Sequence, residues 1–119
     1  DETNIFRASL KIPPLKWSQG IADIAAEHAS QMARGEMPFS HDGFSERVRR
    51  YPMPHLSAAE NLAYNGGVSD TAKVAVDGWI KSPGHRKNLV GSFDLCGIGV
   101  AQSSAGQFFF TQLFARSMG

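Results

Sequence analysis

The sequence predicts an α+β fold: a three-layer α-β-α sandwich with a central antiparallel sheet. Apolar residues recur at helical spacing over residues 18–34 and again over residues 70–80. Over residues 96–115 the period changes to strand-like alternation on either side of a turn at residues 103–106, which is typical of a β-hairpin. Both faces of the second hairpin strand carry apolar side chains, so we expect helices to cover both faces of the sheet.

The first long helix has identifiable ends. We expect Ser18 to cap its N-terminus and Gly35 to end it. Before this helix, Pro13 and Pro14 limit any helix over residues 4–10 to a short one, because proline interrupts helical hydrogen bonding.

Two further helices are predicted after residue 68. We expect Ser69 to cap the helix over residues 70–80. Ser82 followed by Pro83 is typical of a helix start. We therefore expect Ser82 to cap a short helix that carries His85 and ends near Leu89.

The strand that begins near Cys96 alternates apolar side chains with glycine. Gly97 and Gly99 share one face, which should let a helix approach closely. A further short strand is expected over residues 61–64. Cys96 is the only cysteine, so no intrachain disulfide can form, and we expect its thiol to be a small buried apolar group.

The overall composition suits one soluble domain over residues 1–119. The net charge of +1 argues against nucleic acid or an anionic membrane as a partner. Arg47, Arg49 and Arg50 lie close together in the sequence, and we expect them on a solvated surface. No apolar run approaches the about 20 residues of a membrane span, and no signal peptide is visible in this chain.

The four histidines fall into two groups. His28 lies on the apolar stripe of the first long helix and is expected to be a core residue with a hydrogen-bond partner. His55 lies in a proline-rich stretch and is expected in a surface loop. His41 is expected in a loop, and His85 in the first turn of a short helix. At a helix start the dipole favours the neutral imidazole, which is the form that a metal ligand requires.

Glu60 is a carboxylate among apolar neighbours, and such a group is usually paired when it is buried. Together with two imidazoles it would form an incomplete zinc shell of His41, His85 and Glu60, with water in the open position. The spacing of the three residues is not by itself a known metal motif.

Several segments also occur in a characteristic order: Pro14-Leu15-Lys16-Trp17, Phe39-Ser40-His41, Ala59-Glu60-Asn61-Leu62-Ala63, Trp79-Ile80-Lys81-Ser82-Pro83-Gly84-His85-Arg86-Lys87-Asn88-Leu89, Cys96-Gly97-Ile98-Gly99-Val100 and Phe110-Thr111-Gln112. In this order they resemble the CAP superfamily, with its SCP-like extracellular domain. That superfamily groups cysteine-rich secretory proteins, antigen 5 and plant pathogenesis-related proteins. The resemblance covers nearly the whole chain and is to the short, cysteine-poor, bacterial-type branch.

The resemblance implies an α-β-α sandwich and a central cleft lined by two histidines and two acidic residues. His41, Glu60 and His85 match three of these four positions, and the fourth falls on Ser82. The missing acid implies a weaker site for zinc or another divalent cation, which Asp42 or a water would have to complete. Members of the superfamily are secreted, some bind divalent ions, and some bind sterols or fatty acids in separate apolar grooves.

Aromatic residues divide between the core and the cleft in this interpretation. We expect Trp17, Trp79 and the phenylalanines of the last strand in the core. Four residues are expected to line the cleft beside the metal-ligand candidates: Asp42, Ser82, Phe44 and Tyr64.

Three functions stay open at this point. The first is a secreted binding module for a divalent metal, a small molecule or a lipid, and it is favoured over an enzyme. The second is a hydrolase, with Ser82 as nucleophile, His85 or His41 as base and Glu60 as orienting acid, or with a zinc-bound water and Glu60 as base. The expected capping role of Ser82 and the lack of a Gly-x-Ser-x-Gly segment disfavour the serine version. The third is a buried hydrogen-bond network without a ligand.

Overall fold

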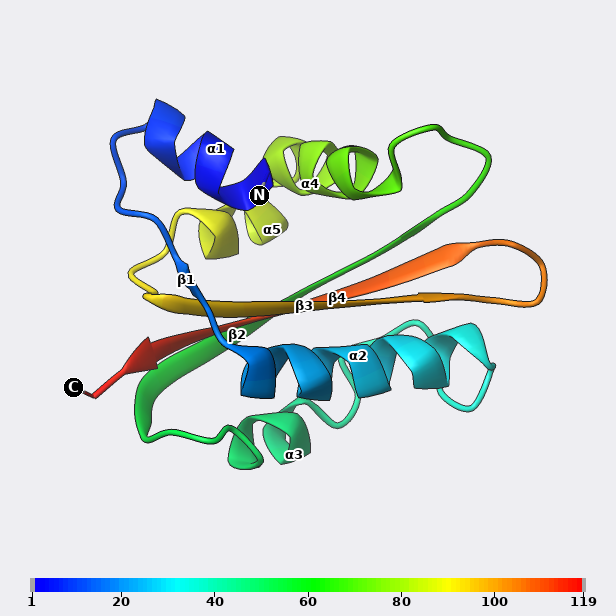
Figure 1. Cartoon of the computed structure of the whole chain (residues 1–119), viewed down its shortest axis with the longest axis horizontal. Coiled ribbons are helices and arrows are strands. Elements are labelled where there is room, and N and C mark those ends of the chain that lie inside the picture. Colours follow the sequence, from blue (N-terminus) through cyan, green and yellow to red (C-terminus); the bar gives the residue numbers. More distant parts are fainter. Residues whose placement is uncertain (1, 119) are drawn as a thin grey trace.

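The computed structural model describes residues 2–118, and it places a four-stranded sheet between two layers of helices (Figure 1). The strands are β1 (Lys16–Trp17), β2 (His55–Asn65), β3 (Leu95–Gln102) and β4 (Phe108–Ser117). The helices are α1 (Glu2–Ser9), α2 (Gln19–Ala33), α3 (Phe44–Arg49), α4 (Thr71–Lys81) and α5 (Pro83–Leu89). Helices α2 and α3 lie on one face of the sheet, and α1, α4 and α5 lie on the other. The predicted three-layer sandwich is confirmed.

The strand order is β1-β3-β4-β2. The β2–β4 and β3–β4 pairs are antiparallel, as predicted, whereas the two-residue strand β1 runs parallel to β3. Strand β1 is too short to produce an alternating pattern, which is why the sequence did not predict it. Strand β2 is an edge strand, and it is longer than the predicted residues 61–64.

His55 was expected in a surface loop, and that prediction is wrong. It begins β2 and is half-buried, with its ring centroid 5.0 Å from that of Tyr51. Trp17 was expected in the core, yet 53% of its surface is exposed. It lies on the edge strand β1, and its indole N–H donates to Gln19 Oε1 at 3.1 Å.

Helix α2 packs directly on β3, as the glycine face predicted. A Cβ atom on Gly97 would lie 2.2 Å from the backbone nitrogen of Ala22, and one on Gly99 would lie 2.1 Å from that of Ala26. Real atoms do not approach this closely, so only glycine permits this contact between the helix and the strand. The contact fixes α2 on the sheet and thereby fixes His28, which α2 carries.

Both faces of the sheet bury an apolar cluster, which confirms that both faces of β4 are covered. On the α2 and α3 side the buried residues are Ile21, Ile24, Ala25, Tyr51, Leu113 and Ala115. On the other side they are Leu15, Ala75, Val76, Trp79, Leu89, Cys96, Phe110 and Phe114. Cys96 is buried as expected, and burial raises the pKa of its thiol to about 11.

The helix ends agree with the sequence in part. Ser18 caps α2, with its Oγ accepting from the backbone N–H of Ile21 at 3.2 Å, as predicted. Asp70, and not Ser69, caps α4, with its Oδ1 accepting from the N–H of Lys73 at 3.1 Å. Helix α3 was not predicted, because six residues are too few to display a helical period.

Candidate functional site

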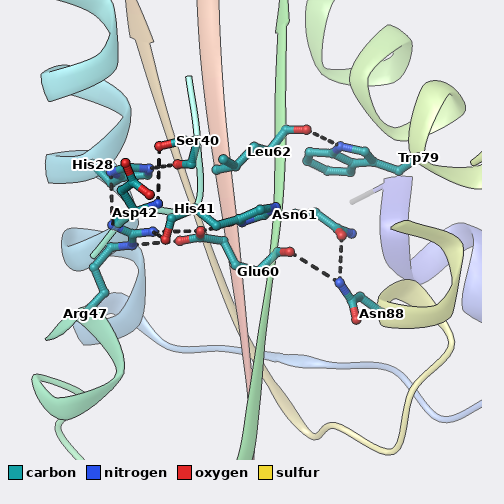
Figure 2. A network of polar contacts seen from close by, with 10 residues as sticks. All are labelled: His28, Ser40, His41, Asp42, Arg47, Glu60, Asn61, Leu62, Trp79 and Asn88. Atoms are coloured by element: carbon teal, nitrogen blue, oxygen red, sulfur yellow. Dashed lines mark hydrogen bonds and ion pairs between the residues drawn. The ribbon is translucent and has the colours of Figure 1, made fainter. Parts of the chain in front are cut away.

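The site is centred on Glu60, in the middle of β2. Its side chain is 1% exposed and faces Arg47 of α3, whose side chain is 4% exposed. Arg47 Nε donates to Glu60 Oε2 at 2.7 Å, and Arg47 Nη2 donates to Oε1 at 2.7 Å (Figure 2). The expectation of a solvated Arg47 is therefore wrong. A buried carboxylate needs a cationic partner, and the bidentate guanidinium supplies one.

Arg47 also holds the loop that carries His41. Its Nη1 donates to the backbone oxygen of Asp42 at 2.7 Å, and its Nη2 donates to that of His41 at 3.2 Å. The same Nη1 lies 3.2 Å from Nδ1 of His28 on α2. One buried side chain thus joins α2, α3, β2 and the loop, as Figure 2 shows.

His28 is a buried, neutral member of this network. It is 1% exposed, and because its Nδ1 accepts from Arg47, its Nε2–H donates to the backbone oxygen of Ser40 at 3.0 Å. Burial lowers the pKa of the imidazole, and the charge of Arg47 lowers it further. The expected core histidine with hydrogen-bond partners is confirmed.

His41 is held at one ring nitrogen and free at the other. Its Nδ1 lies 2.7 Å from Glu60 Oε1, so an ionised Glu60 accepts from Nδ1–H. The side chain of His41 is 56% exposed, in contrast to its buried partner. Among the described residues nothing forms a hydrogen bond with its Nε2, which is left available to a ligand.

His85 on α5 is held in a similar way by Ser82. Its Nδ1 lies 2.9 Å from Ser82 Oγ. Ser82 precedes α5 at the N-cap position, but its side chain makes no capping hydrogen bond, so the expected capping role of its oxygen is wrong. Burial lowers the pKa of His85, and the charge of His41 lowers it further.

Two hollows are lined by successive residues of β2, and the two together are called the cleft. The first, the His41 hollow, has a volume of about 260 Å³ and is lined by His41, Phe44, Ala58, Ala59, Glu60 and Asn88. The second, the His85 hollow, has a volume of about 310 Å³ and is lined by Phe39, Leu62, Ala63, Tyr64, Asn65, Val74, Ala75, Gly78, Trp79, Ser82 and His85. Phe44, Tyr64 and Ser82 thus border the cleft, whereas Asp42 lines neither hollow.

Helices α4 and α5 are tied to the free edge of β2. Trp79 Nε1 donates to the backbone oxygen of Leu62 at 2.9 Å, and Asn88 Nδ2 donates to that of Glu60 at 3.3 Å (Figure 2). Asn88 also donates to Asn61 Oδ1 at 2.9 Å. These bonds cap edge carbonyls that another strand could otherwise pair with, and they fix α5, and so His85, beside the cleft.

The expected zinc ligands do not fit a three-ligand shell. Within residues 2–118, no three side chains of the His, Cys, Asp and Glu types are grouped so that they could hold a metal ion. Both oxygens of Glu60 already accept from Arg47, whose positive charge balances the carboxylate. Glu60 is therefore a poor candidate for a direct ligand, although a carboxylate behind an imidazole is a common arrangement around metals.

The residues of the expected serine hydrolase belong to two separate hydrogen-bonded pairs. Ser82 contacts His85, whereas Glu60 contacts His41. A catalytic triad requires the acid to orient the same histidine that activates the nucleophile. The arrangement in this cleft therefore does not assemble the proposed Ser82 triad.

Comparison with known proteins agrees with the fold. Residues 1–114 match the cysteine-rich secretory protein family, abbreviated CAP. The chain belongs to the CAP family. A solved extracellular protein with an SCP domain from Bacillus anthracis strain Ames is 35% identical, with a TM-score of 0.78, and the match covers 97% of this chain and 38% of that one.

Two further proteins resemble this CAP domain. An outer surface protein from Borrelia burgdorferi has a TM-score of 0.80 at 22% identity, over 98% of this chain and 87% of that one, which shows a shared fold. The uncharacterized membrane protein YlbC of Bacillus subtilis strain 168 is 31% identical over 98% of this chain. The CAP domain spans 33% of that relative's length. None of the described helices is long and apolar enough to cross a bilayer.

Proposed function

We propose that this CAP domain is a ligand-binding module of an extracellular or surface protein, and that its ligand binds in the cleft through the Nε2 atoms of His41 and His85. The observation that carries the proposal is that the side chain of His41 is exposed and yet held in one orientation. Its imidazole is 56% exposed, yet its Nδ1 is fixed at 2.7 Å by a carboxylate that is almost wholly buried. Fixing an exposed ring in one orientation prepares its other nitrogen for a partner.

A purely structural role explains the buried contacts of this network but not the exposed imidazole. Arg47 and His28 bind the backbone of the loop at residues 40–42 through hydrogen bonds, and Arg47 neutralises Glu60. None of these contacts needs the imidazole of His41. The exposed ring is therefore the part of the site that the structural function leaves unexplained.

A location outside the cytoplasm is supported by the relatives. One is named as an extracellular protein and another as an outer surface protein. The His85 hollow has a largely apolar lining, which would suit the apolar part of a ligand. Its volume of about 310 Å³ suits a short apolar group better than a whole sterol.

The test is a nuclear magnetic resonance screen of the isotope-labelled CAP domain with small amides, alcohols and carboxylates. We expect the fragments that bind to shift the signals of His41 and His85, and we expect His41→Ala and His85→Ala to lose this binding. His55→Ala is the matched control, because His55 lies at the far end of β2 and outside both hollows. Fragments that bind only elsewhere, or equally well to His41→Ala, would overturn the proposal.

A further inference from the structure

We infer that the cleft binds a neutral sugar, with the sugar ring packed on the exposed aromatic pair Phe39 and Tyr64. The hydroxyl groups of the sugar bond to Ser82 and His85, which line the same hollow. This inference rests on the proposed function, in which His85 meets the ligand. It goes further by naming the class of ligand and the aromatic residues that hold it.

The first step is the pair of aromatic rings that line the His85 hollow. Tyr64 lies near the end of β2 and is 53% exposed, and Phe39, in the loop after α2, is 45% exposed. Their ring centroids are 4.8 Å apart with an interplanar angle of 79°, and Phe109 of β4 stacks on Tyr64 at 5.7 Å. Two aromatic rings are thus held together with about half of their surface in water. A cluster of exposed apolar side chains is typical of an interaction site.

The aromatic pair is fixed before any ligand arrives. Phe39 directly precedes Ser40, whose backbone oxygen accepts from the buried imidazole of His28 at 3.0 Å. Tyr64 is paired in register with Phe109 across β2 and β4. A ring that is already ordered loses little entropy on binding, so the pair can hold a ligand that is well hydrated and only weakly attracted, such as a sugar.

The second step is the charge of the hollow. None of the described residues that line the His85 hollow is an aspartate, a glutamate, a lysine or an arginine. A charged ligand would lose its hydration there without gaining an ion pair, which is costly. The lining therefore favours a neutral ligand over a carboxylate, a phosphate or a cation.

The third step is the polar pair in this hollow, which can both donate and accept. Ser82 Oγ lies 2.9 Å from His85 Nδ1, and no described residue forms a hydrogen bond with His85 Nε2. If the serine hydroxyl donates to Nδ1, then Nε2–H is a free donor and Oγ is a free acceptor. In the other tautomer of the neutral imidazole, Nε2 accepts and the serine hydroxyl donates. A hydroxyl group also donates and accepts, so adjacent hydroxyls of a sugar match the pair in either tautomer.

A sugar meets the aromatic and the polar requirement in one molecule. The faces of a pyranose ring expose C–H groups, whose partial positive charge suits the negative face of an aromatic ring. The hydroxyls around the ring supply partners for Ser82 and His85. A hydrocarbon chain would leave this polar pair without a partner, which lowers affinity. The volume of about 310 Å³ lies at the small end of ligand sites and suits one sugar ring.

The test on the wild type is a nuclear magnetic resonance titration of the isotope-labelled domain with methyl β-D-glucopyranoside. Glucuronate, a similar ring with a negative charge, and cyclohexanol, a ring with a single hydroxyl, are the control ligands. We expect the glucoside to shift the signals of Phe39, Tyr64 and His85 and to bind at least about fivefold more tightly than either control ligand. Equal or tighter binding of cyclohexanol would show an apolar site, and equal or tighter binding of glucuronate would show that charge is not excluded. Either result would overturn the inference.

Three variants test the two parts of the site separately. Phe39→Ala and Tyr64→Ala should each weaken glucoside binding by about fivefold or more, because each removes a ring that packs on the sugar. Ser82→Ala should weaken it by about fivefold, because it removes a hydrogen-bond partner. Trp17→Ala is the matched control, because Trp17 is also 53% exposed but lies on β1, at the opposite edge of the sheet.

Trp17→Ala should bind the glucoside like the wild type. Unchanged binding in Tyr64→Ala, or an equal loss in Trp17→Ala, would contradict the aromatic site. Should a variant not fold, the wild-type titration still decides the inference.

The two proposals can fail separately. If fragments in the screen bind at His41 and His85 but the glucoside does not bind, the ligand class is wrong, while the binding function stands. If glucoside binding is lost in Tyr64→Ala and unaffected in His41→Ala, the sugar assignment stands and the proposed role of His41 is wrong. If neither the screen nor the titration detects a ligand in the cleft, both proposals are wrong.

Discussion

Arg47 and Glu60 face each other as a bidentate ion pair, with Arg47 Nε 2.7 Å from Glu60 Oε2 and Arg47 Nη2 2.7 Å from Oε1. The two residues are 13 positions apart in the chain, on a short helix and on an edge strand. Because both side chains are buried, each loses its hydration on folding. The attraction between the two charges is what mainly offsets that loss. The pair therefore contributes to the folding stability of the domain and also sets the charge beside the cleft.

The pair makes a first prediction about stability. Arg47→Met should lower the free energy of unfolding by about 3–5 kcal/mol, because it leaves the Glu60 carboxylate buried without a cation. Arg47→Met combined with Glu60→Gln should cost less than the sum of the two single variants. Urea unfolding at pH 7 measures all three. Strict additivity would show that the two side chains are not coupled.

The close contact between α2 and β3 makes a second prediction. Gly99→Ala should destabilise the domain by about 1–3 kcal/mol, because the added Cβ would lie 2.1 Å from the backbone nitrogen of Ala26. Gly78→Ala is the matched control in α4, where a Cβ meets nothing within 4 Å. It should stabilise the domain by about 0.5–1 kcal/mol, because alanine favours a helix. Thermal unfolding of both variants would reveal the opposite signs.

The buried imidazole of His28 makes a third prediction, about pH. Burial lowers its pKa in the folded state, so the unfolded chain takes up a proton first as the pH falls. The contribution of His28 to stability is complete above about pH 6.5, the ordinary value for histidine, and is lost as the pH falls below it. His85, whose pKa is also lowered, contributes with the same sign.

Urea unfolding at pH 7, 6 and 5 measures this dependence. Replacing His28 with glutamine should lower stability at pH 7 and flatten the decline toward pH 5, since one titrating group is removed. A decline as steep as in the wild type would mean that His28 does not cause it.

The two serines before helices make a fourth prediction. Ser18→Ala should cost about 1 kcal/mol, because Ser18 Oγ accepts from the backbone N–H of Ile21. Ser82→Ala should cost less, because the Ser82 side chain makes no capping bond and contacts His85 instead. Chemical denaturation of the two variants compares the costs. An equal loss in both would indicate that Ser82 caps α5 in solution.

Local patterns predicted much of the scaffold. The stripe of α2, the Ser18 cap and the alternation of β3 and β4 are set by neighbours in the chain, and so are the glycines that admit α2. The short elements β1 and α3 escaped prediction, because two or six residues cannot display a period. The cap of α4 was misplaced by one residue, since Ser69 and Asp70 are both suitable capping residues.

The sequence predicted which histidines and which carboxylate form the candidate site, but not how these residues pair. The sequence singled out His41, Glu60 and His85 by residue type and by family resemblance, and the fold brings His41 and Glu60 into contact. It did not indicate Arg47, which lies in an arginine-rich stretch that resembles a solvated surface. One signal was available: a carboxylate in an apolar segment requires a buried cation.

The sequence by itself therefore determined the layers, the family and the identity of the cleft histidines, because these depend on periodicity and on short motifs. Only the tertiary structure decided that Glu60 is neutralised by Arg47, that Ser82 contacts His85 and that the two histidines belong to separate pairs. The physical reason is that charge compensation and burial depend on contacts between residues far apart in the chain. No local pattern in the sequence records those contacts.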